Sequence, residues 1–235
     1  MIASMTLLAE NDYVGMTFWL ATAIMLASTV FFFIERSDVS AKWRTSMTVA
    51  GLVTGLAFWH YLYMREAHLQ GEVTTVFRYI DWLITVPLQI VEFYLILAAV
   101  TAVTSILFWR LLGASLVMLV FGFLGEAGLM DATIGFVIGM AGWIYIIYEI
   151  FSGEASKISA SEGTAASKTA FNALRMIVTV GWAIYPIGYV WGYAGGGSPE
   201  ALNIIYNLAD FLNKIAFGVV IWVAATSPES NKPVS

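Results

Sequence analysis

Long apolar stretches alternate with short polar connections along the chain, and this pattern predicts seven membrane-spanning helices. A helix needs about 20 predominantly apolar residues to cross the hydrocarbon core of a bilayer. Charged, glycine and proline residues gather in the connections, so each stretch is expected to form one separate span. The predicted spans are Tyr13–Ile34, Trp43–Met64, Thr75–Val100, Ser105–Gly125, Thr133–Phe151, Thr169–Tyr193 and Ala201–Thr226.

Two of the connections carry a more specific prediction. The serine- and alanine-rich segment Ser152–Ser167 is expected to be the loosest loop. The connection Glu66–Glu72 is a candidate for a short hairpin around Gln70 and Gly71. Because the sequence has no internal repeat, residues 1–235 are expected to form a single all-α domain, a seven-transmembrane-helix bundle.

The composition supports a membrane location. Hydrophobic residues make up 60% of the chain and charged residues 11%, less than half of the roughly 25% charged share of soluble domains. Most of the surface must therefore face lipid. The net charge of −5 gives no basic footprint for nucleic acid, and the absence of cysteine excludes disulfides and cysteine-ligated metal. With only His60 and His68 as histidines, neither a metal site nor a hydrolytic site is expected.

The basic residues predict how the chain is oriented, because cytoplasmic connections are rich in lysine and arginine. Of the 11 basic residues, Arg65 lies on one side of the predicted spans, and Arg78 and Lys214 lie within them. The N-terminus is therefore expected outside and the C-terminus in the cytoplasm. The remaining eight all fall on the expected cytoplasmic side: Arg36, Lys42, Arg44, Arg110, Lys157, Lys168, Arg175 and Lys232.

Ionisable residues within two of the spans indicate a functional site. A charged side chain at the centre of a span costs roughly 2.5–3.5 kcal/mol on insertion scales, so such residues usually face the bundle interior and mark a site. The third span contains Arg78, Asp81 and Glu92, and the seventh contains Asp210 and Lys214. A structural cluster of ion pairs is the alternative interpretation, but buried ion pairs contribute little to stability.

Lys214 lies near the middle of the seventh span. A buried lysine amine is the group that forms Schiff bases with aldehydes. Asp210 precedes Lys214 by four residues, which places it on the same helix face about 6 Å toward the outside. Asp210 is therefore expected to act as a counter-ion to a protonated Schiff base.

One face of the third span predicts a path for protons. Arg78, Asp81 and Thr85 are spaced by three and four residues, and Glu92 follows Asp81 by eleven. This spacing places all four on one face, with Glu92 about 16 Å deeper toward the cytoplasm. An acid beside a cation stays ionised and can accept a proton, whereas an acid among apolar neighbours stays protonated and can donate one. An outer acceptor and an inner donor predict outward proton transport.

Three motifs in these spans resemble the microbial rhodopsins, and among them the proteorhodopsin subfamily. They are RYIDWLITVP at 78–87, GWAIYP at 181–186 and NLADFLNK at 207–214, and the likeness extends over nearly the whole chain. The resemblance implies a multi-pass protein of a bacterial inner membrane. It also implies a light-driven outward proton pump rather than an enzyme, with all-trans retinal covalently bound to Lys214.

The resemblance further assigns a role to each buried charge. Asp81 matches the proton acceptor and primary counter-ion, and Asp210 the second counter-ion. Arg78 matches the outer gate partner, and Glu92 matches the cytoplasmic proton donor. The set Asp81, Thr85 and Glu92 is the pattern of the proton pumps of this family.

Two further residues are assigned by resemblance. His60 matches a histidine that pairs with the acceptor and links neighbouring subunits, where a residue like Trp19 comes from the next protomer. This implies a homo-oligomer of five or six protomers; a satisfied structural hydrogen bond is the alternative role of His60. Gln89 matches the position that tunes colour, and glutamine there implies blue absorption. A hydrogen bond between helices is the alternative role of Gln89.

Flat aromatic side chains are expected to enclose the polyene. The expected lining residues are Trp82, Trp182, Tyr185 and Pro186 from the matched motifs, together with Met118, Gly122 and Tyr206.

Two competing functions remain open from the sequence. A photosensor would hold the same chromophore and signal through a partner, but sensors often lack an acid at the position of Glu92. A seven-helix receptor or transporter without retinal is the third possibility. Glu126 and Glu149 lie near the ends of spans and are expected to be interfacial rather than functional.

Overall fold

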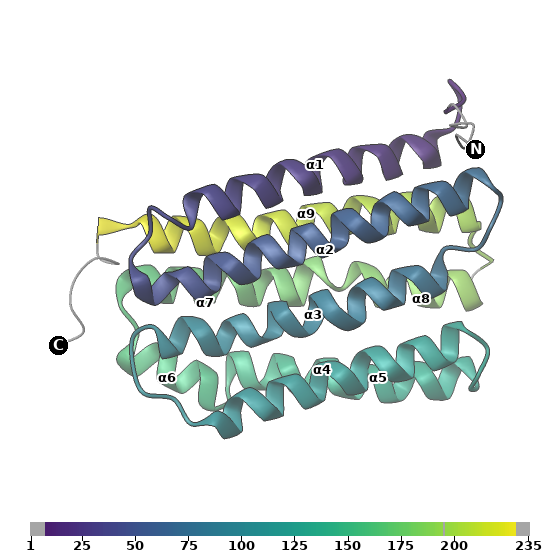
Figure 1. Ribbon diagram of the computed structural model, residues 1–235. Coiled ribbons are helices and arrows are strands. Elements are labelled where there is room, and N and C mark those ends of the chain that lie inside the picture. Colours follow the sequence, from purple (N-terminus) through teal and green to yellow (C-terminus); the bar gives the residue numbers. More distant parts are fainter. Residues whose placement is uncertain (1–7, 195, 229–235) are drawn as a thin grey trace.

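The computed structural model describes residues 8–194 and 196–228, and over these residues the chain forms a bundle of seven long helical rods (Figure 1). Rods that are consecutive in the chain run in alternating directions, so that α1 begins and α9 ends at opposite ends of the bundle. The elements are α1 (Tyr13–Glu35), the 3₁₀ turn η1 (Ala41–Trp43), α2 (Arg44–Leu69), α3 (Thr75–Ala98), α4 (Ser105–Glu126), α5 (Ala132–Phe151), α6 (Glu154–Glu162), α7 (Ala165–Met176), the π turn η2 (Ile177–Gly181), α8 (Ile184–Ala194) and α9 (Pro199–Thr226). The seven predicted spans are therefore confirmed as helical rods.

Side-chain caps fix where four of the rods begin, and the cap of α7 is Thr164, whose hydroxyl oxygen accepts from the Ser167 amide at 3.2 Å. The Asp12 carboxylate accepts a hydrogen bond from the Gly15 amide at the start of α1, at 2.7 Å. Asp131 and Ser198 cap α5 and α9 in the same way, at 3.0 and 3.1 Å. A helix leaves its first amides without partners inside the helix, so each cap stabilises its start by about 1 kcal/mol.

The segment expected to be the loosest loop instead contains a short helix, α6. The Glu149 carboxylate, buried with 1% of its surface exposed, accepts a hydrogen bond from the Ala155 amide at 3.1 Å. Glu154 forms an ion pair with Arg110. These contacts satisfy the start of α6 and attach it to α4 and α5. Glu149 is therefore not the interfacial residue that the sequence predicted.

The hairpin considered at Gln70 and Gly71 is wrong, because α2 continues to Leu69 and ends in a tight turn. The Glu72 amide donates to the Ala67 carbonyl and the Gly71 amide to the His68 carbonyl, both at 2.9 Å. Gly71 has a φ of +74°, a conformation that costs glycine little. This pattern of two hydrogen bonds is a common helix terminator.

The sixth span is interrupted rather than continuous. A π turn joins α7 to α8, and the Trp143 indole donates to the Val178 carbonyl at 3.0 Å. The Asn213 amide donates to the Gly181 carbonyl at 3.1 Å. Side chains from α5 and α9 therefore satisfy backbone carbonyls at the interruption, which lies beside Pro186. Such π turns are frequent at functional sites.

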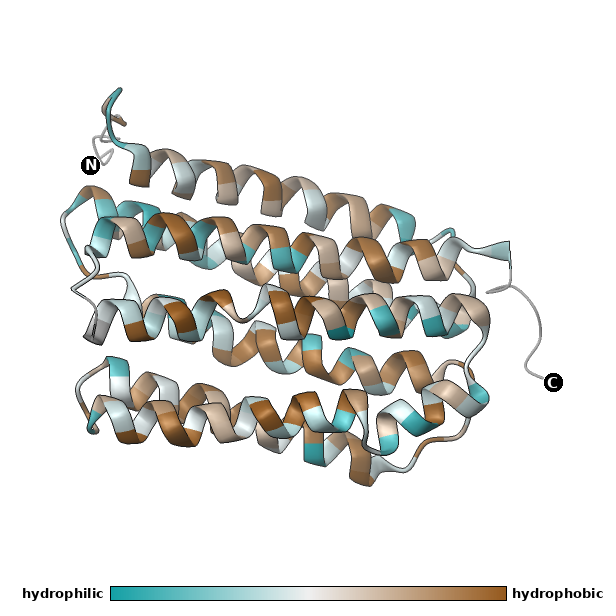
Figure 2. Cartoon of the chain, turned by 180° about the vertical axis from the view of Figure 1, so that it is seen from behind, coloured by the Kyte–Doolittle hydropathy of each residue, from teal (hydrophilic) through white to brown (hydrophobic). Residues whose placement is uncertain are grey.

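The surface of the bundle is apolar, whereas its centre contains charged groups. Trp59, Val137 and Leu212 are 59–70% exposed, while Asp81 and Asp210 are completely buried. Apolar residues predominate along the rods and polar ones at their ends and in the connections (Figure 2). Among the described residues, six helical segments are long and apolar enough to cross a membrane, and the more polar α2 is not one of them. This distribution suits a bundle surrounded by lipid.

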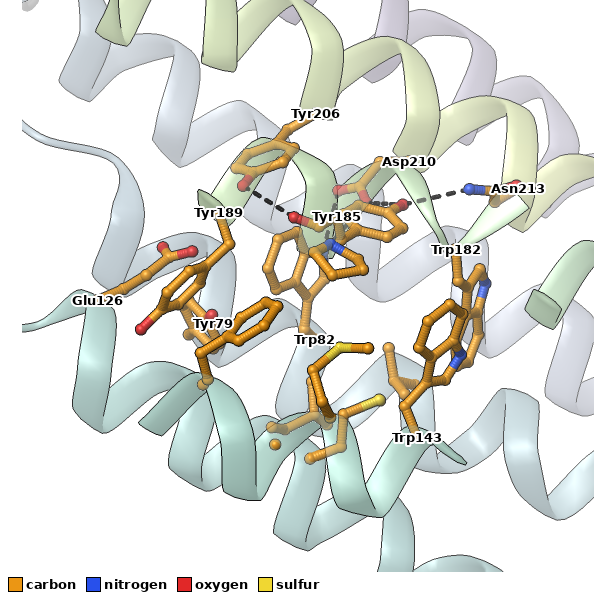
Figure 3. Close-up of a pocket in the computed structure, with 18 of the residues that line it drawn as sticks. Tyr79, Trp82, Glu126, Trp143, Trp182, Tyr185, Tyr189, Tyr206, Asp210 and Asn213 are labelled. Carbon is orange, nitrogen blue, oxygen red and sulfur yellow. Dashed lines mark hydrogen bonds between the residues drawn. The ribbon is translucent and has the colours of Figure 1, made fainter. Parts of the chain in front are cut away.

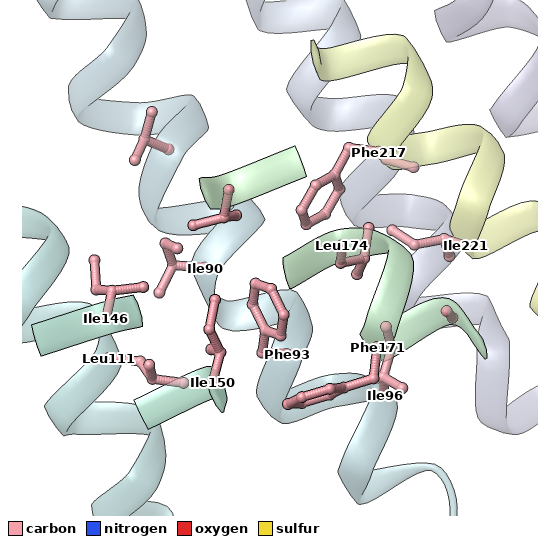
Figure 4. Close-up of a cluster of buried hydrophobic side chains, with 14 of the residues drawn as sticks. Ile90, Phe93, Ile96, Leu111, Ile146, Ile150, Phe171, Leu174, Phe217 and Ile221 are labelled. Atoms are coloured by element: carbon pink, nitrogen blue, oxygen red, sulfur yellow. The ribbon is translucent and has the colours of Figure 1, made fainter. Parts of the chain in front are cut away.

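An apolar cluster fills the half of the bundle nearest α6 (Figure 4). The members labelled in Figure 4 come from α3, α4, α5, α7 and α9 and are at most 2% exposed. The cluster separates the charged centre from the end of the bundle where α6 lies. Its members include Ile90, Phe93, Ile96, Leu111, Ile146, Ile150, Phe171, Leu174, Phe217 and Ile221.

Candidate functional site

The amine of Lys214 lies between two carboxylates at the centre of the bundle. Lys214 Nζ is 2.9 Å from Asp81 Oδ2 and 3.3 Å from Asp210 Oδ2. Lys214 is 3% exposed and both aspartates are completely buried. The structure therefore brings together the lysine and the two acids that the sequence singled out on α3 and α9.

The two aspartates have different surroundings. Asp210 accepts hydrogen bonds from the hydroxyls of Tyr61 and Tyr185, each at 2.7 Å, and from the indole of Trp82 at 3.1 Å. Asp81 Oδ1, in contrast, has no hydrogen-bond partner among the described residues. Hydrogen bonds to a carboxylate stabilise its charged form. Asp81 therefore has an oxygen available to take a proton, whereas both oxygens of Asp210 are engaged.

His60 lies beside Asp81 but does not donate a hydrogen bond to it. His60 Nδ1 is 3.5 Å from Asp81 Oδ1 and 2.8 Å from the Leu56 carbonyl oxygen. A neutral imidazole that carries its proton on Nδ1 donates that proton to Leu56, because a carbonyl only accepts. His60 therefore lies close to Asp81, as expected, but no hydrogen bond joins the two side chains.

Arg78 lies beside Asp210, nearer than Asp81 to the start of α3. One guanidinium nitrogen is 3.7 Å from Asp210 Oδ2 and donates to the Tyr61 hydroxyl at 3.0 Å. The other donates to the side-chain oxygens of Asn207 and Asn203, at 2.8 and 3.1 Å. Arg78 is 2% exposed, so these partners stabilise a buried cation in one position.

Thr85 and Glu92 continue the same face of α3 but do not reach Lys214. The Thr85 hydroxyl donates to the backbone carbonyl of Asp81 at 3.0 Å, and not to its carboxylate. Glu92 is completely buried, and its carboxyl oxygens have no well-formed hydrogen bond within the described part of the chain. The buried hydroxyl of Ser46 is close enough to interact with the Glu92 carboxyl. Eleven residues separate Glu92 from Asp81, a rise of about 16 Å along α3.

A cavity extends from Lys214 between α3, α4, α5, α8 and α9 (Figure 3). Trp82 makes edge-on ring contacts with Tyr185 and Tyr206, with ring centres 5.0 and 5.8 Å apart. Gln89 reaches the cavity with an amide nitrogen that has no partner among the described residues. All the expected lining residues border this cavity: Trp82, Gln89, Met118, Gly122, Trp182, Tyr185, Pro186 and Tyr206.

Several site residues were not predicted. The fifth helix contributes a wall that includes Phe136, Met140 and Trp143, and the one charged residue of that predicted span, Glu149, does not line the cavity. A signal did exist on α9, where Asn203, Asn207, Asp210 and Lys214 recur at intervals of four, three and four residues. This spacing marks one polar stripe along the helix, and it includes both asparagines that hold Arg78.

Comparisons with known proteins agree with this geometry. The blue-light absorbing proteorhodopsin of Gamma-proteobacterium Hot 75m4 is 60% identical over 225 residues, which cover 94% of this chain and 89% of that protein. The green-light absorbing proteorhodopsin of Gamma-proteobacterium EBAC31A08 is 58% identical over 227 residues, covering 95% and 91%.

Solved structures give the same result. The crystal structure of blue light-absorbing proteorhodopsin from Med12 is similar with a TM-score of 0.80 and 64% identity, covering 94% of this chain and all of that one. The Exiguobacterium sibiricum rhodopsin follows with a TM-score of 0.82 and 33% identity, covering 93% and 98%. The family model described as bacteriorhodopsin-like protein matches residues 12–227. The chain therefore belongs to the bacteriorhodopsin-like family.

Proposed function

We propose that this protein is a light-driven outward proton pump of a bacterial inner membrane, with all-trans retinal bound to Lys214. One observation carries the proposal: the Lys214 amine lies between Asp81 and Asp210, fully enclosed, at one end of an aromatic cavity. An amine in this position can form a Schiff base with an aldehyde. The protein is a transporter and not an enzyme, and residues 1–235 act as a single domain.

The residues present fit retinal. The cavity is lined by the aromatic rings of Trp82, Trp182 and Tyr185, which suit a flat, apolar group, and carries an amine at one end. When bound, retinal supplies a delocalised cation that absorbs visible light and a change of shape that moves this charge relative to the carboxylates. In the dark, the charges of Asp81 and Asp210 balance those of Lys214 and Arg78.

Asp81 serves as proton acceptor because of its surroundings. Its Oδ2 already contacts the Lys214 nitrogen at 2.9 Å, and its Oδ1 has no partner in the described part of the chain. Asp210 stays ionised because Tyr61, Tyr185 and Trp82 all donate to it. Asp210 therefore acts as the fixed counter-ion, and the proton moves to the other acid.

Glu92 serves as proton donor on the opposite side. It is enclosed at the level of the apolar cluster that closes this half of the bundle, so water reaches it poorly. An enclosed carboxyl without a cation nearby holds its proton until the Lys214 nitrogen needs one. Because the acceptor and the donor lie on opposite sides of Lys214 along α3, transport has one direction.

Replacing Glu92 with glutamine is expected to slow recovery after a flash by about 100-fold or more, because positioned general acids contribute factors of this size. Colour should remain, since Glu92 does not line the cavity at Lys214. Flash photolysis would measure the recovery time, and added azide, a small soluble acid, should restore the rate. Recovery at the original rate without azide would remove the donor role from Glu92.

The proposed orientation rests on the basic residues. Arg36, Arg44, Arg110 and Lys168 lie at or near the helix ends on the α6 side of the bundle, and Arg65 lies near the opposite end. Lysine and arginine are enriched in cytoplasmic connections. The α6 end is therefore cytoplasmic and the start of α1 faces outward. Lys232, counted for the same side, lies outside the described residues.

Gln89 sets a blue absorption maximum. Its side-chain amide borders the cavity about one helical turn beyond Thr85, and the amide nitrogen has no protein partner among the described residues. A polar group at this place changes the energy gap of a delocalised cation. Gln89→Leu is expected to shift the absorption maximum to longer wavelength while proton transport continues. An unchanged spectrum in the purified variant would assign Gln89 a structural role only.

We infer a homo-oligomer of five or six protomers, in which His60 links neighbours. His60 is close to Asp81, and 14% of its side chain is exposed. Trp19 is 40% exposed, with the Arg65 guanidinium 4.0 Å from its ring centre. An exposed aromatic ring fixed in this way is suited to contact the next protomer.

The photosensor is the runner-up, and ion substitution distinguishes it from the pump. The protein would be reconstituted with all-trans retinal into liposomes, in a medium where sodium and chloride are replaced by potassium and an impermeant anion, with valinomycin added to dissipate the membrane potential. A light-driven pH gradient of undiminished size is expected, because protons are the transported ions. A coloured protein that builds no gradient would favour the photosensor, and a colourless protein would exclude both.

A further inference from the structure

Two cations share one carboxylate oxygen of Asp210. Lys214 Nζ is 3.3 Å from Asp210 Oδ2, and a guanidinium nitrogen of Arg78 is 3.7 Å from the same atom. The positive charge of Arg78 offsets part of the field that Asp210 exerts at the Lys214 nitrogen, and it does so more strongly the closer it lies. The position of Arg78 therefore affects how firmly Asp210 holds a positive charge on that nitrogen.

Asn207 holds the other side of the Arg78 guanidinium. The Asn207 side-chain oxygen accepts from the second terminal nitrogen of Arg78 at 2.8 Å, and Asn203 accepts from the same nitrogen at 3.1 Å. Asn207 is completely buried and Arg78 is 2% exposed, so no bulk water competes for these bonds. The guanidinium thus has one terminal nitrogen at Asp210 and the other at Asn207.

A residue of α1 determines which way the Asn207 amide faces. The Thr17 hydroxyl donates its single proton to the Val14 carbonyl at 2.7 Å, so its oxygen acts as an acceptor toward Asn207. The amide nitrogen of Asn207 donates to this oxygen at 2.9 Å. The amide oxygen is left to face Arg78, whose guanidinium carries only donors.

We propose that Asn207 is a positioning residue that sets the colour of the retinal-bound protein through Arg78. By holding one guanidinium nitrogen, Asn207 keeps the Arg78 charge from moving closer to Asp210 Oδ2. Asp210 therefore acts at full strength on the Lys214 nitrogen. A nearby anion favours positive charge on that nitrogen in the ground state, whereas excitation spreads the charge away from it. A stronger counter-ion thus raises the excitation energy. This inference rests on the proposed retinal linkage at Lys214.

Two substitutions of Asn207 are expected to shift the absorption maximum in opposite directions. Asn207→Leu keeps a similar shape but removes the oxygen, so Arg78 moves toward Asp210 and the maximum moves to longer wavelength. Asn207→Asp places an anion against the guanidinium and draws it away from Asp210, so the maximum moves to shorter wavelength. Spectra of the retinal-bound variants would be recorded at alkaline pH, which keeps Asp81 and the introduced carboxyl ionised.

Asn172→Leu and Asn172→Asp are the matched controls, because Asn172 is exposed on α7 and does not line the cavity at Lys214. Both controls should keep the spectrum of the original chain. A visible band in each variant shows that it folds and binds retinal. Asn207 variants that shift in the same direction, or that do not shift, would overturn the proposal, because a merely structural role predicts no opposite signs.

A second measurement does not depend on retinal. In the retinal-free full chain with isotope-labelled arginine, the NMR signals of the Arg78 side chain are assigned by their absence from Arg78→Gln. These signals should move in both Asn207 variants and stay in both Asn172 controls. Unmoved signals would overturn the positioning role even where the protein is coloured. If the original chain binds no retinal, the role in colour fails together with the retinal linkage, and moved signals still support Asn207 as the residue that positions Arg78.

Discussion

Lys214→Ala is expected to abolish all visible absorption of the protein purified from cells supplied with retinal. The amine is the one group at the end of the aromatic cavity that can bond covalently to an aldehyde among the described lining residues. The substitution also leaves Asp81 and Asp210 buried without the cation between them. Losing one partner of a buried ion pair typically costs about 3–5 kcal/mol, so lower thermal stability is expected together with loss of colour.

Lys168→Ala is the matched control, because this lysine lies at the α6 end of α7, away from the cavity. It should bind retinal with the spectrum of the original chain. Absorption spectra and circular dichroism of both variants would separate loss of the chromophore from loss of helices. A folded Lys214→Ala variant that keeps a stable visible band would contradict the assignment of Lys214.

Asp81→Asn is expected to keep colour but to reduce light-driven proton export by about 100-fold or more, the contribution of a positioned proton acceptor. The asparagine can occupy the same space, and Asp210 with its three hydrogen-bond donors still balances the cation. No carboxylate then lies 2.9 Å from the Lys214 nitrogen to take its proton. Pumping would be measured as pH change per amount of coloured protein.

Asp38→Asn provides the control for this substitution, since Asp38 is exposed in the connection between α1 and α2. It removes one carboxylate without touching the site and should pump normally. Export by Asp81→Asn at the rate of the control would show that another group accepts the proton. The acceptor role would then have to move to Asp210.

The spans and the charged residues were predictable from the sequence for a simple physical reason. Lipid requires long apolar helices, so any charge within them stands out. The spacing of Asp210 and Lys214, and of Arg78 and Asp81, fixes which residues share a helix face. Which residues of different helices come into contact could not be predicted in this way. The difference between the two aspartates depends on Tyr61 and Tyr185, which come from α2 and α8.

What the sequence missed also depends on contacts between distant segments. The π turn in the sixth span receives hydrogen bonds from Trp143 and Asn213, and neither residue is near it in the chain. Helix α6 forms because buried Glu149 meets its first amides, although its composition is typical of a loop. Glu126, expected to be interfacial, lines both the cavity at Lys214 and a second cavity among the connections at the outer end of the bundle, which its position at the end of a span does not reveal.

The most direct test of outward pumping is the pH outside intact cells. Cells expressing the chain with all-trans retinal would be illuminated in unbuffered medium, with and without a protonophore. The account predicts acidification of the medium in the light, abolished by the protonophore, and absent in Asp81→Asn. A medium that turns alkaline, or a coloured protein that leaves the pH unchanged, would contradict it.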